Sequence, residues 1–169
     1  MALHLRRVDS SNLWELLDLS VTKEQEEADF VASNSVSILE AYACLVDGKH
    51  ALPFGLYDGE VPVGFLMLGY DSQEGDPEIA SGNYCLWRLM VDARYQRQGY
   101  GRRAVELALD CIRAFPCGPA ELCWLSYTPE NTAARELYHS LGFRETGELV
   151  DEELVAVLPL AGAGSETEG

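Results

Sequence analysis

A glycine- and arginine-containing segment, QRQGYGR at residues 96–102, lies directly before an amphipathic helical pattern. Glycine has no Cβ, so the backbone can approach a ligand closely. The first amide groups of a helix have no partners within it and carry the positive end of its dipole, so they can bind phosphate oxygens. Flanking arginines add charge-assisted hydrogen bonds. The segment predicts a polyanion site, although a turn without a ligand can have the same pattern.

Two common phosphate-binding motifs are absent from the sequence. There is no GxxxxGK[ST] segment, so the chain has no P-loop. There is also no GxGxxG after an early strand with an acidic residue ~20 positions further on, which argues against a dinucleotide-binding fold.

A second candidate pair, Asn131 and Tyr138, lies in the helical pattern TAARELYHSL. At 100° per residue, positions seven apart differ by only ~20° around a helix axis. Both side chains are therefore expected at the margin of the buried face, where a polar tip can reach a ligand. Tyr138 could instead pack its ring and leave its hydroxyl in water.

These residues are positioned by a predicted α/β fold. Hydrophobic patterns and turn signals predict the order β-α-α-β-β-β-α-β-α-β-β, which is a mixed, mostly antiparallel twisted sheet of about seven strands with about four helices on both faces. Asp58-Gly59 marks a hairpin, and Ser33 or Asn34 can cap the second helix. We expect one domain over residues 1–160 and a disordered tail at 161–169.

Composition excludes several classes of protein. The net charge of −16 makes nucleic acid an improbable partner, because phosphate backbones need a basic face. Five cysteines without a CxxC pair argue against a disulfide framework or a zinc cluster, and the three histidines show no metal-ligand spacing. No apolar run approaches the ~18 residues of a membrane span, and no secretory signal is evident. We expect a cytoplasmic protein without a metal.

The charges are unevenly distributed along the chain. Six of the twelve basic residues lie between positions 88 and 113, whereas acidic residues gather at 23–29, 71–78 and 144–153. This pattern indicates one region for an anion and several regions that would attract a cation, although a solvated acidic surface is also compatible with it.

Taken together, the two segments resemble the GCN5-related N-acetyltransferases (GNAT family). Q-x-x-G-x-G at 96–101 resembles that family's acyl-CoA pyrophosphate loop. The segment Asn131-x-x-Ala134-x-x-x-Tyr138-x-x-x-Gly142-Phe143 resembles its next helix and strand, and the element order agrees across nearly the whole chain. Segments such as LWRLMVDARYQRQGYG look closest to the bacterial spermine/spermidine acetyltransferase-like branch.

The resemblance implies acetyl-CoA as co-substrate and a role for each matching residue. Tyr138 would be the catalytic proton donor to the departing thiolate, and Asn131 would face the pantetheine. The remaining cofactor-binding residues would be Leu89, Met90 and Val91 along the pantetheine and Gln96, Arg97, Gln98, Gly99, Tyr100, Gly101 and Arg102 at the pyrophosphate.

The implied acceptor is a small cationic amine, with polyamines first. Some polyamine acetyltransferases have a glutamate on the strand before the loop, but Trp87-Arg88 stands here, so no single base is identified. Glu40 and Trp87 are tentative substrate residues, although an exposed acidic helix edge and a core tryptophan explain them equally well. Aminoglycoside or protein amines, a non-catalytic acetyl-CoA-binding module and a homodimer remain open.

Overall fold

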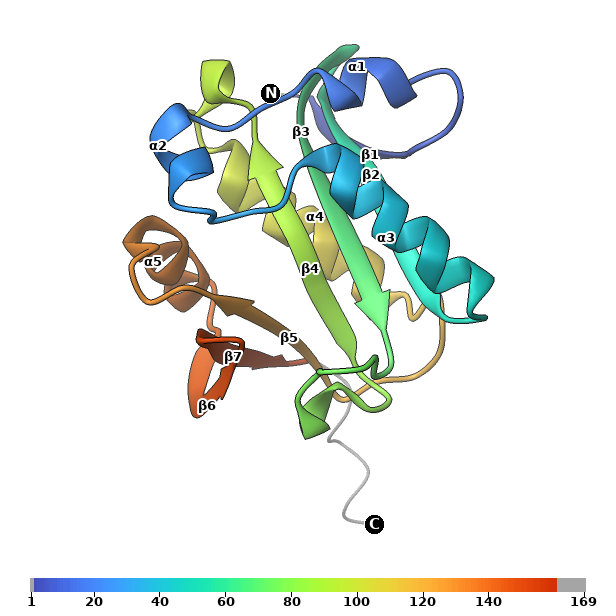
Figure 1. The fold of residues 1–169 in the computed structure, drawn as a ribbon, viewed down its shortest axis with the longest axis vertical. Helices are drawn as coiled ribbons and strands as arrows, with labels where there is room; N and C mark the ends of the chain where they lie inside the picture. The colour runs from blue at the N-terminus through green and yellow to red at the C-terminus, as the bar shows by residue number, and fades with distance from the viewer. Residues whose placement is uncertain (1, 161–169) are drawn as a thin grey trace. The chain divides into compact units, whose positions relative to one another are not determined.

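The computed structural model describes residues 2–160, so the tail predicted at 161–169 lies outside the described residues (Figure 1). The helices and strands follow the predicted order closely. In chain order they are β1 (Leu3–Arg7), α1 (Leu13–Leu17), α2 (Lys23–Glu27), α3 (Asn34–Val46), β2 (His50–Asp58), β3 (Val61–Tyr70), η1 (Glu78–Ala80), β4 (Tyr84–Val91), η2 (Ala93–Tyr95), α4 (Tyr100–Arg113), β5 (Leu122–Tyr127), α5 (Thr132–Ser140), β6 (Arg144–Val150) and β7 (Glu153–Pro159).

The seven strands are hydrogen-bonded in the order β1-β2-β3-β4-β5-β7-β6. The β4–β5 pair is parallel, whereas the β1–β2, β5–β7 and β6–β7 pairs are antiparallel. This topology confirms the predicted mixed, mostly antiparallel α/β sheet.

The described residues contain five α-helices, where the sequence predicts about four. The additional helix is α2, which lies in an acidic segment without an apolar stripe. A capping box stabilises its start: the Gln25 amide donates to Thr22 Oγ1 at 3.3 Å, and the Thr22 amide donates to Gln25 Oε1 at 3.2 Å. Hydrophobic periodicity therefore did not predict α2, because this helix is specified by its capping box and has no apolar stripe.

The chain divides into two compact units. Unit 1 comprises residues up to Gly69 together with Leu86–Leu109, and unit 2 comprises Tyr70–Cys85 and the residues from Asp110 onward. Strand β4 and helix α4 each contribute to both units. A single domain over residues 1–160 stays a prediction.

Unit 1 has helices on both faces of its strands: α3 lies in front of β2 in Figure 1, and α4 lies behind β3 and β4. Its first strand pairs with β2 in a register that runs from Leu3 opposite Asp58 to Arg7 opposite Phe54. Ser33 caps α3, as predicted, by accepting the Val36 amide at 3.3 Å. One apolar cluster of this unit includes Leu16, Tyr57, Phe65, Met67 and Met90.

Unit 2 is organised around β5, β6 and β7. Strand β5 pairs with β7 over its whole length, from Leu122 opposite Pro159 to Tyr127 opposite Leu154. The first residues of β4 join this unit, because Tyr84 pairs with Cys123. Within residues 2–160, no helix has both the length and the apolar character that a membrane crossing needs.

Candidate active site

The end of strand β4 is held tightly within unit 1. Met90 is buried, and Asn34 of α3 donates one hydrogen bond to the Leu16 carbonyl at 2.8 Å and a long contact to Met90 Sδ at 3.9 Å. Gly64 on β3 lies so close to Met90 that a Cβ there would collide with the Met90 carbonyl oxygen. The three predicted pantetheine-facing residues therefore lie on a strand end with little freedom to move.

A buried aspartate fixes the turn that follows β4. Asp92 accepts hydrogen bonds from the Ser20 amide at 3.0 Å, the Arg94 amide at 3.0 Å and Arg94 Nε at 2.8 Å. Burial acts to raise the pKa of Asp92, but the hydrogen bonds and charge of Arg94 and the Ser20 amide outweigh it and hold that pKa below its usual value. The turn thus has an ionised carboxylate at its centre.

The predicted pyrophosphate loop has an unusual backbone. Arg97 and Gly99 both have positive φ angles, +62° and +83°, which glycine adopts easily and arginine does not. Gln96, predicted to open the loop, donates from Nε2 to the Val91 carbonyl at 2.9 Å and to Gln25 Oε1 at 2.8 Å. Its side chain therefore holds the loop to the end of β4.

Helix α4 begins at the end of this loop. The Arg103 amide donates to the Gly99 carbonyl at 3.2 Å, and the earlier amides of the first turn have no partners within the helix. Tyr100 is buried, and its hydroxyl donates to Asp58 Oδ2 at 2.6 Å, which raises the pKa of Tyr100. The guanidinium groups of Arg102 and Arg103 both contact Glu106, at 3.6 and 3.4 Å. The start of α4 thus has two arginines, each paired with Glu106, next to amides without helical partners.

In unit 2, helix α5 carries the other predicted pair. Asn131 is the N-cap of this helix, and its Oδ1 accepts the Ala134 amide at 3.3 Å. This bond engages the carboxamide oxygen in the helix start and leaves the nitrogen as the group that could meet a ligand.

Tyr138 is buried about two turns further along α5. Its ring stacks on Tyr127 with 5.8 Å between centroids and meets Phe143 edge-on at 5.7 Å. Burial raises the pKa of Tyr138, so the phenol stays protonated throughout the neutral range. Within the described chain its hydroxyl has no hydrogen-bond partner.

A polar network supports the ring beneath Tyr138. Glu145 accepts the Tyr127 hydroxyl at 2.7 Å, and Arg135 contributes Nε at 2.7 Å and a second nitrogen at 2.9 Å to the same carboxylate. His139 Nε2 lies 3.6 Å from Glu145 Oε1. The Tyr127 hydrogen bond and the Arg135 charge lower the pKa of Glu145. This network was not predicted from the sequence, where a tyrosine at a strand end was its only signal.

The two tentative substrate residues have partners in unit 1. Glu40 accepts hydrogen bonds from Arg88 at 3.1 and 3.4 Å, and Trp87 packs against the apolar core. Arg88 Nε is a buried donor without a partner among the described residues. Glu40 is therefore one half of an ion pair rather than an isolated carboxylate.

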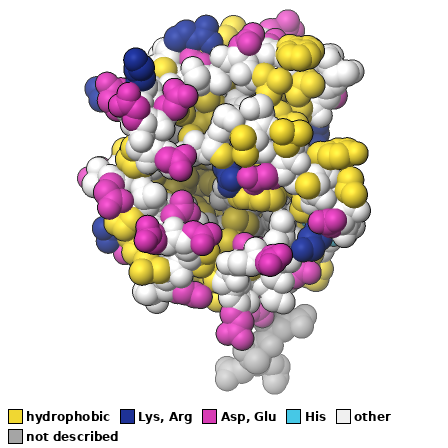
Figure 2. Space-filling view, viewed as in Figure 1, with side chains coloured by type: hydrophobic (Ala, Val, Ile, Leu, Met, Phe, Trp, Pro, Cys, Tyr) yellow, Lys and Arg dark blue, Asp and Glu magenta, His cyan; other side chains and the backbone are white. Residues whose placement is uncertain are grey.

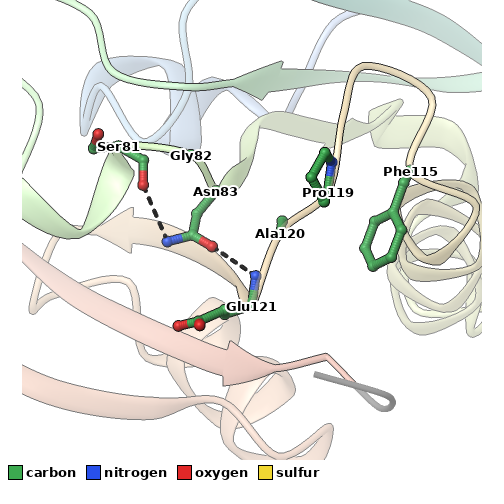
Figure 3. Close-up of a pocket in the computed structure, with 7 residues that line it drawn as sticks. All are labelled: Ser81, Gly82, Asn83, Phe115, Pro119, Ala120 and Glu121. Atoms are coloured by element: carbon green, nitrogen blue, oxygen red, sulfur yellow. Dashed lines mark hydrogen bonds between the residues drawn. The ribbon is translucent and has the colours of Figure 1, made fainter. Parts of the chain in front are cut away.

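Unit 2 also has an open pocket of about 450 Å³, which Figure 3 shows. Asn83 lies at its centre, with its amide nitrogen donating to the Ile79 and Ser81 carbonyls and its oxygen accepting the Glu121 and Leu122 amides. The side chain is thus fully engaged in holding three backbone segments together. None of the predicted site residues lines this pocket.

Groups of three or more His, Cys, Asp or Glu side chains with metal-binding geometry are absent from residues 2–160.

Comparison with known families decides the assignment. The model of the acetyltransferase (GNAT) family matches residues 12–143, which include β4, the loop, α4 and Tyr138. The chain belongs to this family. As a GNAT member it is an N-acetyltransferase.

The known relatives of this GNAT enzyme differ in their acceptors. The spermine/spermidine N(1)-acetyltransferase of Bacillus subtilis (strain 168) is 30% identical over 151 residues, which cover 88% of this chain and 92% of the relative. The [ribosomal protein bS18]-alanine N-acetyltransferase of Escherichia coli (strain K12) is 45% identical over 60 residues, or 36% of this chain and 38% of the relative. Aminoglycoside acetyltransferase AAC(6')-Ib in complex with coenzyme A and kanamycin has the same fold, with a TM-score of 0.75 at 17% identity over 93% of this chain and 94% of that one.

Proposed function

We propose that this GNAT enzyme transfers an acetyl group from acetyl-CoA to a primary amine of a small cation, with spermidine or spermine as the first candidate acceptors. The observation that carries the proposal is the match to the Bacillus subtilis polyamine enzyme, which spans nearly the full length of both chains. The net charge of −16 supports a cationic acceptor, because an acidic field concentrates cations near the protein. We expect the enzyme to act in the cytoplasm.

The coenzyme is proposed to bind through main-chain groups. The amides from Arg97 through Arg102 would take the pyrophosphate, supported by the positive φ angles of Arg97 and Gly99 and by the helix start at Tyr100. Leu89, Met90 and Val91 would hold the pantetheine through their backbone. A backbone amide near Met90 would also stabilise the oxyanion of the tetrahedral intermediate.

The acceptor must lose a proton before it attacks. An alkylammonium with a pKa near 10.4 is only about 0.04% neutral at pH 7, which corresponds to about 4.6 kcal/mol. The neutral nitrogen then attacks the thioester carbonyl to form a tetrahedral intermediate. As the carbonyl re-forms, the C–S bond breaks, the thiolate of coenzyme A departs, and the nitrogen loses its second proton to solvent. A base or a water chain is required for the first step, and we assign no single residue to it.

Tyr138 is proposed to protonate the departing thiolate. At ordinary pKa values, near 10 for tyrosine and 8.5 for a thiol, this transfer is uphill by about 2 kcal/mol. Burial raises the pKa of Tyr138, which guarantees the protonated form but makes the phenol a weaker acid. The step therefore requires a thiolate close to the hydroxyl.

The deciding experiment measures thiol release from acetyl-CoA across a panel of acceptors. Spermidine and spermine are expected to turn over fastest, ahead of kanamycin and a peptide with an N-terminal alanine. If kanamycin or the alanine peptide turns over fastest, that compound replaces the polyamine as the proposed acceptor. Tight acetyl-CoA binding without turnover on any amine would indicate a non-catalytic binding module.

Two variants test the proposed residues in the same assay. Tyr138→Phe keeps the ring and removes the acid, so turnover should fall by about 10²-fold while acetyl-CoA affinity stays unchanged. Glu40→Gln should raise KM for spermidine several-fold with kcat retained if the Glu40 carboxylate attracts the polyamine. An unchanged kcat in the first variant would remove Tyr138 from the mechanism.

A further inference from the structure

Helix α3 has a second apolar face that nothing in unit 1 covers. Its buried face consists of Asn34, Ser37, Ala41 and Cys44. The opposite side carries large exposed apolar side chains, with exposed fractions of 43% for Val36, 67% for Leu39, 68% for Tyr42 and 68% for Val46. We call these four residues and Ala43 the outer α3 stripe.

Helical geometry places the stripe on one side of α3. At 100° per residue its five members fall within an arc of roughly 120°, whose centre is about 180° from the centre of the buried arc. A helix that is apolar on both sides is normally buried on both sides. Figure 2 shows hydrophobic side chains gathered where α1 and α3 lie, and α1 adds Trp14, which is 75% exposed. This surface therefore has the character of an interface.

The distribution of charge makes this surface a better place than the rest of the chain for two copies to meet. The whole chain has a net charge of −16, so two copies repel each other over most of their surfaces. The outer α3 stripe has no charged member, and Glu40 is the only charged residue in the helix. Glu40 is already paired with Arg88 at 3.1 Å. Two copies can meet here without burying an unpaired charge.

The residue pattern is also self-complementary. In an antiparallel pair of α3 helices whose two-fold axis lies level with position 41, Val36 of one copy faces Val46 of the other, Leu39 faces Ala43, and Tyr42 lies opposite the ion-paired Glu40. A two-fold dimer requires this kind of self-matching surface. Antiparallel helices also bring opposite ends of their dipoles together. The pattern thus fits pairing with itself.

The available area is adequate for a dimer. Aromatic side chains present ~150–250 Å² and aliphatic ones ~60–120 Å², so the exposed parts of the stripe and Trp14 amount to roughly 500 Å² of apolar surface. A stable interface buries about 800 Å² per partner, of which about two-thirds is apolar at its centre. The apolar core of such an interface is therefore already present on one protomer.

We propose that the outer α3 stripe is the interface of a two-fold symmetric homodimer in which the α3 helices pack antiparallel. This inference is independent of the acceptor and of the acetyl-transfer chemistry. It predicts that the full chain in solution has twice the monomer mass of 18.7 kDa.

The test is sedimentation velocity of the full chain from about 1 to about 100 μM, a range that detects micromolar dissociation constants. The unmodified chain should be dimeric at the upper end. Leu39→Glu and Val46→Glu should each raise the dissociation constant at least tenfold, because each buries an unpaired charge. Leu149→Glu, at a residue 60% exposed on β6, is the matched control and should remain dimeric. Circular dichroism confirms that each variant is folded.

A mixing experiment tests the antiparallel arrangement. Leu39→Glu and Ala43→Lys chains should each be monomeric, whereas an equimolar mixture should form a mixed dimer, because residue 39 of one copy faces residue 43 of the other. A folded, unmodified chain that is monomeric at about 100 μM overturns the proposal and leaves another protein as the occupant of the stripe. A mixture that stays monomeric overturns the antiparallel pairing.

Discussion

Tyr127 stacks on Tyr138 with 5.8 Å between ring centroids and 24° between ring planes. The Tyr127 hydroxyl at the same time donates to Glu145 at 2.7 Å, and Glu145 is held by Arg135. The ring beneath the proposed catalytic phenol is thus fixed at its far end by a charged network. This arrangement makes Tyr127 a positioning residue for Tyr138 in the proposed mechanism.

Tyr127→Phe tests this relationship, because it keeps the stacked ring and removes only the hydroxyl. The free energy of unfolding should fall by about 1.5–3 kcal/mol, the usual range for a hydrogen bond to a charged group. Turnover should fall several-fold with little change in KM for acetyl-CoA. Ser72→Ala removes an exposed hydroxyl outside the site and the outer α3 stripe, and it should change neither quantity. A Tyr127→Phe enzyme with normal kcat would show that the Glu145 contact does not position Tyr138.

The backbone of the proposed pyrophosphate loop can be tested at Gly99. Its φ of +83° strains any other residue, and Gly147 has nearly the same φ, +87°, in β6. A Cβ at either position meets nothing within 4 Å, so the two alanine variants share a conformational cost of about 1–2 kcal/mol without a clash. Calorimetry should show weaker acetyl-CoA binding for Gly99→Ala, by roughly tenfold, and unchanged binding for Gly147→Ala. Equal acetyl-CoA affinities of the two variants would show that the nucleotide does not bind at the 96–102 loop.

The pH dependence of turnover reports on Tyr138. Burial raises the pKa of this phenol above the ordinary tyrosine value of 10.0, so its acidic form persists to higher pH than in free tyrosine. We expect kcat to show no loss between pH 8 and about 10 that can be attributed to tyrosine ionisation. A tyrosinate absorbance that appears below pH 10 in wild type, but not in Tyr138→Phe, would contradict this expectation.

The Glu145 network should also affect stability at low pH. The pKa of Glu145 lies below its ordinary value of 4.5, so its contribution to stability is complete above pH 4.5 and is lost as the pH falls through the lower, folded-state pKa. Urea unfolding should therefore show Glu145→Gln to be less stable than wild type at pH 7 and closer to wild type at pH 3. Glu148→Gln, on the same strand, serves as the control. A gap between wild type and Glu145→Gln that is the same at both pH values would indicate that the charge of Glu145 does not stabilise the fold.

Gly64 offers a test of how closely β3 and β4 must approach. A Cβ at this position would meet the Met90 carbonyl oxygen, which is backbone and cannot rotate away. Gly64→Ala should destabilise the chain by about 1–3 kcal/mol and weaken acetyl-CoA binding, because relieving the clash displaces the β4 end. Thermal unfolding and calorimetry measure the two effects. An unchanged melting temperature of Gly64→Ala would mean that β3 and β4 accommodate the added Cβ without a loss of stability.

Local patterns in the sequence were sufficient for most of the fold. Strand alternation, Ser33 at a helix start and Asp58-Gly59 between two apolar runs each depend on neighbours within a few residues, and their elements occur as predicted. The loop at 96–102 was found in the same way, because glycine positions and a helix start are local features. Helix α2 was missed because its capping box was not recognised.

The residue contacts of the candidate site could not be predicted in this way. Arg88 meets Glu40 across 48 positions of the chain, and Glu145 reaches Tyr127 across 18. Such pairs depend on sheet register and helix packing, and these cannot be predicted from a short segment of the sequence. The sequence by itself determined the element order, the glycine positions before α4 and the family resemblance. Only the tertiary structure decided that Glu40 is paired, that Tyr138 is buried on a braced ring, and that α3 keeps an apolar face exposed, because these depend on which side chains folding brings together.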